Sequence, residues 1–248
     1  MLVVFLGTGG AGAPPGRAHN CLLVETEDTR IILDVGEGCS QRLMELGYSL
    51  CDIDYVYISH LHFDHYSGLA DLAVRGVIEG CRRAKLALHK SLVEEAAEKI
   101  TLLLPRSLRS EVSFYGLDDQ AELARSLTIR LSPTCHTVPT YSIALAAGGS
   151  RLFYTADTRP CKPLYDAIAS WKPDLLIHEA TLPDGLEEMC ESAGHSTVNH
   201  AVRAKDLLGD DAMLALVHLS VESEAQLRRA RRLPRGVFAP YDKSMLSI

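Results

Sequence analysis

Residues 59–68 read SHLHFDHYSG and directly follow the apolar, β-branched run 55–58. Three histidines and an aspartate fall within six positions, at the end of what the sequence predicts to be a buried strand. Imidazoles crowded in this way repel one another once protonated, and they lose hydration when they are buried without partners. Such a cluster therefore needs a compensating interaction.

A bound metal ion supplies that interaction. In an extended chain His60 and His62 point to the same side, because side chains alternate with a period of two. Asp64 and His65 follow where the chain turns toward an expected helix, so the four side chains can converge on one small volume. Neutral imidazole and carboxylate are ligands that zinc accepts. The pattern predicts a metal site.

Further candidate ligands stand at the ends of three other expected strands. They are His136 after 127–131, Asp157 after 151–155 and His218 at the end of 212–218. The 60–65 cluster alone offers more donors than one tetrahedral zinc uses while it keeps a position open for water. We therefore expect two metal ions, and manganese or iron would also suit a His/Asp donor set.

Strand-like and helix-like segments alternate along the chain without a low-complexity linker. Expected strands are 2–6, 21–25, 30–34, 55–59, 85–88, 127–131, 141–146, 151–155, 174–178, 212–218 and 236–239. Expected helices are 40–46, 67–79, 91–104, 162–170, 197–208 and 222–232. Hairpins occur beside βα steps, so mixed sheets covered by helices fit better than a purely parallel sheet. We expect one domain over residues 1–248.

Net charge, the length of apolar runs and the cysteine spacing limit the classes of protein to which this sequence could belong. The net charge of −7 argues against a broad nucleic-acid-binding surface, although the basic clusters 82–85 and 228–235 could form local patches. No apolar run is long enough to span a membrane, and no basic region precedes the N-terminal apolar run, so we expect a cytoplasmic protein. Seven scattered cysteines without a Cys-x-x-Cys pair predict reduced, buried thiols.

The glycine-rich stretch 7–16, GTGGAGAPPG, is not a nucleotide-binding loop. It lacks the Gly-Lys-Ser/Thr of a P-loop, and the prolines at 14 and 15 would block the helix that a dinucleotide-binding fold needs there. We expect a loop that closely approaches another part of the molecule.

HLHFDH with the downstream His136, Asp157 and His218 resembles the metallo-β-lactamase superfamily. The resemblance implies an αβ/βα four-layer sandwich, in which two mixed sheets lie back to back with helices outside. It also implies that one zinc binds the first set, His60, His62 and His136, and that the other binds Asp64, His65 and His218. Asp157 would bridge the two ions together with a water or hydroxide.

Several stretches resemble the ribonuclease Z branch of that superfamily. They are FLGTGG (5–10), LDVGEGCSQ (33–41), CHTVPTY (135–141), HEAT (178–181) and GHST (194–197). The resemblance implies that Glu179 and His195 act together near the leaving group, with Asp64 as a further catalytic residue. It makes Arg17, in the loop near the tRNA end, and Ser196 candidates for substrate binding. Family members are commonly dimers, so a homodimer is expected.

One family feature is missing from this sequence. Ribonuclease Z enzymes usually insert a tRNA-gripping arm between the motifs that match His136 and Asp157, but here an expected hairpin fills most of that interval. Three interpretations follow: a zinc-dependent ribonuclease Z-like endonuclease that holds RNA by another surface, a phosphodiesterase for small or cyclic phosphates, and a non-catalytic metal-binding protein on the same scaffold. The intact ligand set argues against the third.

Overall fold

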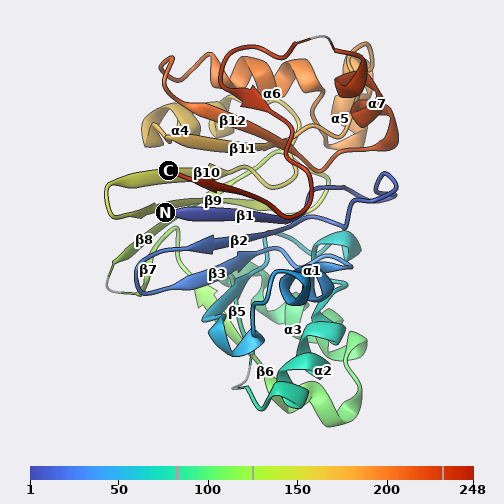
Figure 1. The fold of residues 1–248 in the computed structure, drawn as a ribbon, viewed down its shortest axis with the longest axis vertical. Coiled ribbons are helices and arrows are strands. Elements are labelled where there is room, and N and C mark those ends of the chain that lie inside the picture. Colours follow the sequence, from blue (N-terminus) through green and yellow to red (C-terminus); the bar gives the residue numbers. More distant parts are fainter. Residues whose placement is uncertain (82–83, 125, 231) are drawn as a thin grey trace.

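The computed structural model describes residues 1–81, 84–124, 126–230 and 232–248, and two seven-stranded mixed sheets form its centre (Figure 1). Arg82 and Arg83 of the first expected basic cluster and Arg231 of the second lie outside the described residues. Among the helices described, none is both long and apolar enough to cross a membrane.

The first sheet contains most of the N-terminal half of the chain and one C-terminal strand. Its order is β14 (Ser244–Ser247), β1 (Leu2–Gly7), β2 (Cys21–Glu25), β3 (Arg30–Leu33), β4 (Tyr55–Tyr57), β5 (Ala84–His89) and β6 (Val112–Leu117). Pairing is antiparallel from β14 to β3 and parallel from β3 to β6.

The second sheet repeats this division between antiparallel and parallel strands. Its order is β13 (Val237–Phe238), β12 (Met213–Val217), β11 (Leu175–Glu179), β10 (Ser150–Tyr154), β9 (Tyr141–Ala147), β8 (Leu127–Pro133) and β7 (Gln120–Ala124). Pairing is parallel from β13 to β10 and antiparallel from β10 to β7.

Helices cover the outer faces of both sheets (Figure 1). The first sheet carries α1 (Cys39–Glu45), α2 (Leu69–Glu79) and α3 (Val93–Leu103), and the second carries α4 (Lys162–Trp171), α5 (Cys190–Ala193), α6 (Val198–Lys205) and α7 (Val221–Arg229). Short 3-10 turns are η1 (Leu50–Asp52), η2 (Phe63–His65), η3 (Lys90–Leu92), η4 (Arg106–Glu111) and η5 (Glu187–Met189). The predicted four-layer arrangement is confirmed.

Successive side chains of β1 point alternately into two apolar cores, which explains why this strand is apolar throughout. Val3 and Phe5 enter the core between the two sheets, whereas Val4 and Leu6 enter the core under the first set of helices. A strand buried on both faces needs apolar side chains at every position, which removes the usual alternation with polar residues. Such strands can be predicted from the sequence because their apolar runs are continuous.

Three strands, β6, β7 and β14, were not expected. All three are edge strands, and each contains exposed residues along its length. A strand that is half exposed at a sheet edge has a weaker apolar pattern than a central strand. In β14, pairing with β1 places Leu246 opposite Val3 and makes the chain's last strand part of the first sheet.

The cysteines differ from the expectation. The prediction of reduced thiols is wrong for six of them, which form the disulfides Cys21–Cys39, Cys51–Cys81 and Cys135–Cys161, while Cys190 is a buried thiol. The partners are 18, 30 and 26 residues apart in sequence. Spacings of that length carry no pairing signal, and only the folded chain brings these residues together.

Candidate metal centre

The predicted ligands all follow the carboxyl ends of strands. His60, His62, Asp64 and His65 lie beyond β4 of the first sheet, and the others lie on three loops of the second sheet. His136 is in the β8–β9 connection, Asp157 follows β10, and His218 follows β12. Face-to-face packing of the sheets places these ends along one edge of the sandwich, where the side chains meet.

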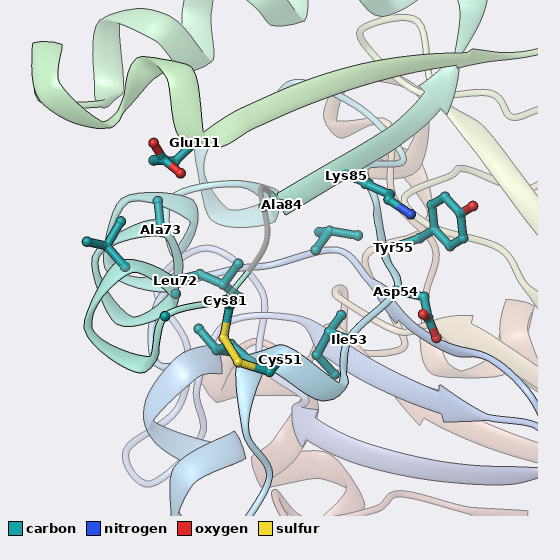
Figure 2. Close-up of a pocket in the computed structure, with 15 residues that line it drawn as sticks. Cys51, Ile53, Asp54, Tyr55, Leu72, Ala73, Cys81, Ala84, Lys85 and Glu111 are labelled. Carbon is teal, nitrogen blue, oxygen red and sulfur yellow. A yellow bond between two sulfur atoms is a disulfide. The ribbon is translucent and has the colours of Figure 1, made fainter.

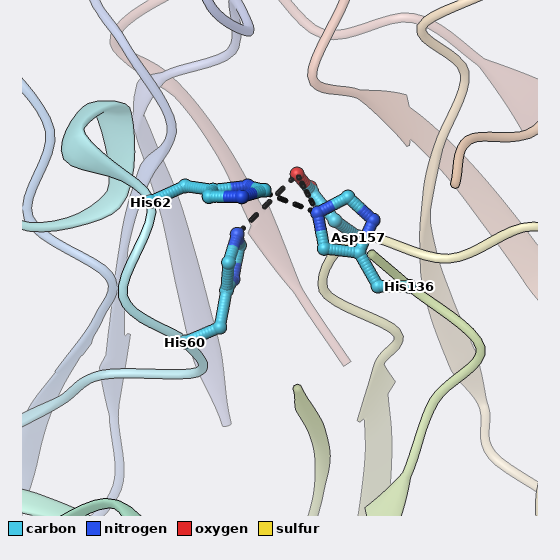
Figure 3. A group of neighbouring side chains, drawn as sticks. All are labelled: His60, His62, His136 and Asp157. Carbon is cyan, nitrogen blue, oxygen red and sulfur yellow. Dashed lines mark hydrogen bonds and ion pairs between the residues drawn. The ribbon is translucent and has the colours of Figure 1, made fainter. Parts of the chain in front are cut away.

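One group consists of His60, His62, His136 and Asp157, whose candidate donor atoms lie within 4.8 Å of one another (Figure 3). Nε2 of His136 is 3.0 Å from Nδ1 of His62. Oδ2 of Asp157 is 3.6 Å from Nε2 of His60 and 3.8 Å from Nε2 of His136. Three imidazoles and one carboxylate therefore face a common centre.

A second group consists of Asp64, His65 and His218. Nε2 of His218 is 3.1 Å from Nε2 of His65 and 3.1 Å from Oδ2 of Asp64. Asp157 reaches this group too, because its Oδ2 is 3.3 Å from Nε2 of His65 and its Oδ1 is 3.4 Å from Nε2 of His218. One carboxylate thus stands between two sets of donors.

Unsatisfied buried atoms show that these residues fit a cation. Nε2 of His60 and Oδ1 of Asp157 are buried without a hydrogen-bond partner. Such atoms cost free energy unless something satisfies them, and a divalent cation between them would do so. The seven residues supply only imidazole and carboxylate donors, the set that zinc and similar metals bind. The residues at this edge, called the metal cluster below, therefore fit a bound metal ion.

Burial favours the neutral, metal-binding form of three of the histidines. It lowers the pKa of His60, His62 and His136, so these imidazoles are neutral near pH 7 and keep a lone pair for a metal. At His65 burial acts in the same direction, but the carboxylates of Asp157 and Asp34 outweigh it and raise the pKa. A cation in the cluster would take the place of that proton.

Asp34 supports one of the predicted ligands from behind, a role that the sequence did not predict. Its side chain is fully buried, its Oδ2 is 2.8 Å from Nδ1 of His65, and both Ser59 and Tyr154 donate hydrogen bonds to it. A carboxylate that holds the far nitrogen of a ligating histidine fixes the ring and its tautomer. The available signal was an aspartate in the LDVGEG stretch directly after an apolar strand.

Glu179 and His195 form the pair that the HEAT and GHST motifs suggested. Oε1 of Glu179 is 3.1 Å from Nδ1 of His195, and Glu179 is almost fully buried. Burial opposes a charged imidazole, but the Glu179 carboxylate outweighs it and raises the pKa of His195 to about 9. His195 remains 18 % exposed. Its hydrogen bonds run through Nδ1, which leaves Nε2 for a group outside the protein.

Thr181 connects this pair to the metal cluster, and the sequence analysis did not identify its role. Its hydroxyl lies 2.8 Å from Oε2 of Glu179 and 2.8 Å from Nδ1 of His218.

Ser196, a candidate for substrate binding, also lies beside Glu179. Its amide donates a hydrogen bond to Glu179, and its hydroxyl donates one to the carbonyl of Thr158. Ser196 is fully buried, so the geometry makes it a support for Glu179.

Arg17 is held in a structural network with the C-terminal segment. Its side chain is 4 % exposed, its Nε is 3.3 Å from Oε1 of Glu224, and its Nη1 donates to the carbonyl of Pro240 at 2.7 Å. Its guanidinium also lies over the ring of Tyr241, 5.0 Å from the centroid. These contacts tie the N-terminal loop to the C-terminal segment, and they do not support the predicted substrate contact.

The glycine-rich stretch 7–16 behaves as expected and closely approaches another residue. A Cβ added at Gly10 would lie 2.5 Å from Cε1 of His218, a distance that only glycine permits. The Gly10 amide donates to the carbonyl of Leu219 at 3.1 Å. The loop therefore packs directly on a residue of the metal cluster.

A cavity of about 380 Å³ lies outside this cluster (Figure 2). It is next to Tyr55 at the start of β4, whereas the metal cluster follows the other end of that strand. The Cys51–Cys81 disulfide lies on its wall, and its charged residues are Asp54, Lys85 and Glu111. None of the described residues that line it is a histidine, and the candidate ligands lie at the opposite end of β4.

Known proteins resemble this chain along most or all of its length. A family model described as "Anti-Pycsar protein Apyc1" matches residues 1–199. Ribonuclease Z of Metallosphaera sedula is 27 % identical over 305 residues, covering 100 % of this chain and 99 % of that protein. Zinc phosphodiesterase ELAC protein 2 of Mus musculus is 30 % identical over 231 residues, covering 81 % of this chain and 27 % of that longer protein.

A solved structure shares the fold. The metallo-β-lactamase fold protein YhfI of Bacillus subtilis superposes with a TM-score of 0.81 at 20 % identity, covering 99 % of each chain. Together with the sequence relatives, this confirms the predicted superfamily and its ribonuclease Z-like branch. The predicted class of enzyme, a metal-dependent phosphodiester hydrolase, is confirmed with them.

Proposed function

The chain belongs to the family described as "Anti-Pycsar protein Apyc1", and we propose that residues 1–248 form one hydrolase domain that cleaves phosphodiesters with two zinc ions. The observation that carries this proposal is the convergence of seven imidazole and carboxylate side chains around Asp157. Two groups of donors that share one carboxylate suit two ions better than one.

The two sites divide as the superfamily resemblance implies. The first zinc would be held by His60, His62 and His136, and the second by the other three ligands, with Asp157 between them. The residues of the second set are Asp64, His65 and His218. When bound, a zinc pair lowers the pKa of water to about 7 and neutralises charge on the phosphodiester oxygens.

The protein's own groups orient the reaction. Asp64 lies at the second site and can accept a hydrogen bond from the attacking water, which aligns it with the phosphorus. His195 holds a proton at neutral pH because Glu179 stabilises the imidazolium. Its Nε2 can donate that proton to the departing oxygen, and Glu179 keeps the ring in the required tautomer.

Removing single ligands tests the proposal. Asp64→Ala and His62→Ala are expected to abolish hydrolysis of bis(p-nitrophenyl) phosphate and to lower bound zinc, measured by elemental analysis, while circular dichroism stays native. His89→Gln is the matched control, because His89 stacks on Tyr141 and belongs to neither group of candidate ligands. Full activity in either ligand variant would refute the assignment. Zinc-loaded protein that hydrolyses no phosphodiester would favour the non-catalytic interpretation.

RNA is the first candidate substrate, because the similar Metallosphaera protein is named ribonuclease Z. A small or cyclic phosphodiester is a second candidate, and two observations favour it. The interval between His136 and Asp157 is occupied by the β9–β10 hairpin, so the described chain has no arm there. Cations near the cluster are paired with carboxylates, as in Arg159–Glu191 at 2.9 Å, which leaves less positive charge for a polyanion.

A substrate panel separates the two candidates. Pre-tRNA, short single-stranded RNA and 2′,3′-cyclic nucleotides would each be tested with zinc and with manganese. Cleavage of pre-tRNA at a defined 3′ position, with affinity that falls steeply as salt rises, supports the nuclease. Turnover of cyclic nucleotides alone supports the small-molecule phosphodiesterase.

A homodimer and a cytoplasmic location complete the proposal. On α2 the apolar side chains of Val77 and Ile78 are 51 % and 66 % exposed, as suits a subunit contact. Light scattering should give twice the chain mass for the native protein and the chain mass for Val77→Asp.

The cytoplasmic location is tested by cell fractionation. The three disulfides argue against it, because disulfides are typical of oxidising compartments.

A further inference from the structure

Phe63 is the aromatic residue inside the HLHFDH motif, between the proposed ligands His62 and Asp64. It is 59 % exposed, whereas the other four phenylalanines of the chain are buried or half-buried. Neighbouring Cα atoms lie about 3.8 Å apart, so the backbone of Phe63 stands beside both ligands. An apolar ring is thus presented to solvent from the segment that carries the proposed ligands.

The backbone that carries this ring is held firmly. The η2 turn is closed by the His65 amide, which donates to the carbonyl of His62 at 3.0 Å, and by the Ser67 amide, which donates to the carbonyl of Phe63 at 2.8 Å. The Phe63 ring also meets Tyr66 edge to face, with centroids 5.9 Å apart at 74°. The ring is exposed but braced, so little freedom is lost when a flat ligand packs on it.

We propose that Phe63 is a stacking platform for the nucleobase that adjoins the phosphodiester, an inference that rests on the proposed function. Every nucleobase has a π face, and stacking on an exposed aromatic ring is a sequence-tolerant way to hold one. This contact needs no positive charge, which agrees with the pairing of Arg159 with Glu191. Phe63 is therefore a specificity-determining residue that selects nucleoside phosphodiesters over those without a base.

The experiment compares substrates with and without a base. The cyclic arm uses adenosine 2′,3′-cyclic phosphate and the methyl riboside 2′,3′-cyclic phosphate. The RNA arm uses a short oligonucleotide and the same oligonucleotide with an abasic residue at the cleavage position. Each is measured with wild-type protein and with Phe63→Leu, which removes the ring but keeps an apolar side chain. Tyr115→Leu, an exposed aromatic on the edge strand β6, is the control.

Phe63→Leu should lower kcat/KM for the base-bearing substrate about tenfold more than for its base-free counterpart. Phe63→Trp should restore the preference, and Tyr115→Leu should leave both rates unchanged. The arm in which the effect appears identifies the source of the base. The proposal would be overturned if Phe63→Leu left the ratio of kcat/KM for the two substrates unchanged. This includes an equal fall on both substrates together with loss of the dimer in light scattering. If wild-type protein cleaves no phosphodiester, the proposed function fails, and the stacking role falls with it.

Discussion

Replacing Asp34 by asparagine should weaken zinc binding without unfolding the protein. Asp34 has a φ of 55°, in the left-handed region that asparagine tolerates well, so the backbone accepts the change. Its Oδ2 faces Nδ1 of His65 and the hydroxyls of Ser59 and Tyr154. An amide nitrogen in that place cannot accept their hydrogen bonds. It would donate to Nδ1 of His65 instead and force the ring proton onto Nε2, the nitrogen that faces the cluster.

The expected loss is large enough to measure. Removing the carboxylate that supports a ligating histidine typically lowers metal affinity about 10- to 100-fold, which corresponds to about 1.4–2.8 kcal/mol. Zinc affinity would be measured by competition with a chromophoric chelator, and urea unfolding monitored by circular dichroism would confirm that the variant is folded. Lost hydrogen bonds add a destabilisation of about 1–3 kcal/mol to the apoprotein.

Tyr154→Phe is the matched control for this prediction. It removes one hydrogen bond to Asp34 but leaves the carboxylate on His65 in place. It should cost about 1 kcal/mol of stability and change zinc affinity by less than about threefold. Wild-type zinc affinity in a folded Asp34→Asn protein would show that Asp34 does not position His65, and the reasoning would be refuted.

Three further predictions concern the pair of Glu179 and His195, the loop that contains Gly10, and the three disulfides. Glu179→Gln should lower kcat about 10²-fold or more with little change in bound zinc, because the imidazolium of His195 loses its charged partner; an unchanged rate would remove this pair from the reaction. Gly10→Ala should displace His218 and reduce zinc affinity, whereas Gly209→Ala, with nothing within 4 Å of the added Cβ, should not; equal affinities would contradict the close packing of the loop. Denatured, unreduced protein should titrate one thiol, that of Cys190, and seven after reduction; seven before reduction would exclude the three disulfides.

Zinc binding should also depend on pH. The ligands must be deprotonated to bind, so apparent zinc affinity falls as pH is lowered, and chelation should inactivate the enzyme with recovery on adding zinc. The test is the chelator competition repeated at several pH values. Affinity that does not vary with pH would argue against a site built from histidines.

The short-range pattern of the chain determined much of this protein. Continuous apolar runs such as β1 required burial on both faces, and the spacing of HLHFDH placed His60, His62, Asp64 and His65 near one point. These features depend on neighbours along the backbone, and local geometry is enough to infer them. The edge strands β6, β7 and β14 carried no such pattern, and partners in space define them instead.

The family resemblance implied that the predicted ligands meet, and that Glu179 meets His195, but only the tertiary structure decided which other distant groups meet. Arg17 was a candidate for substrate contact, but folding places Glu224 against its guanidinium and buries it. Asp34 is unremarkable in the sequence until His65, 31 residues away, turns its ring toward it. The disulfides follow the same rule. Contacts between residues far apart in the chain are set by how the two sheets pack, and no spacing along the sequence encodes that packing.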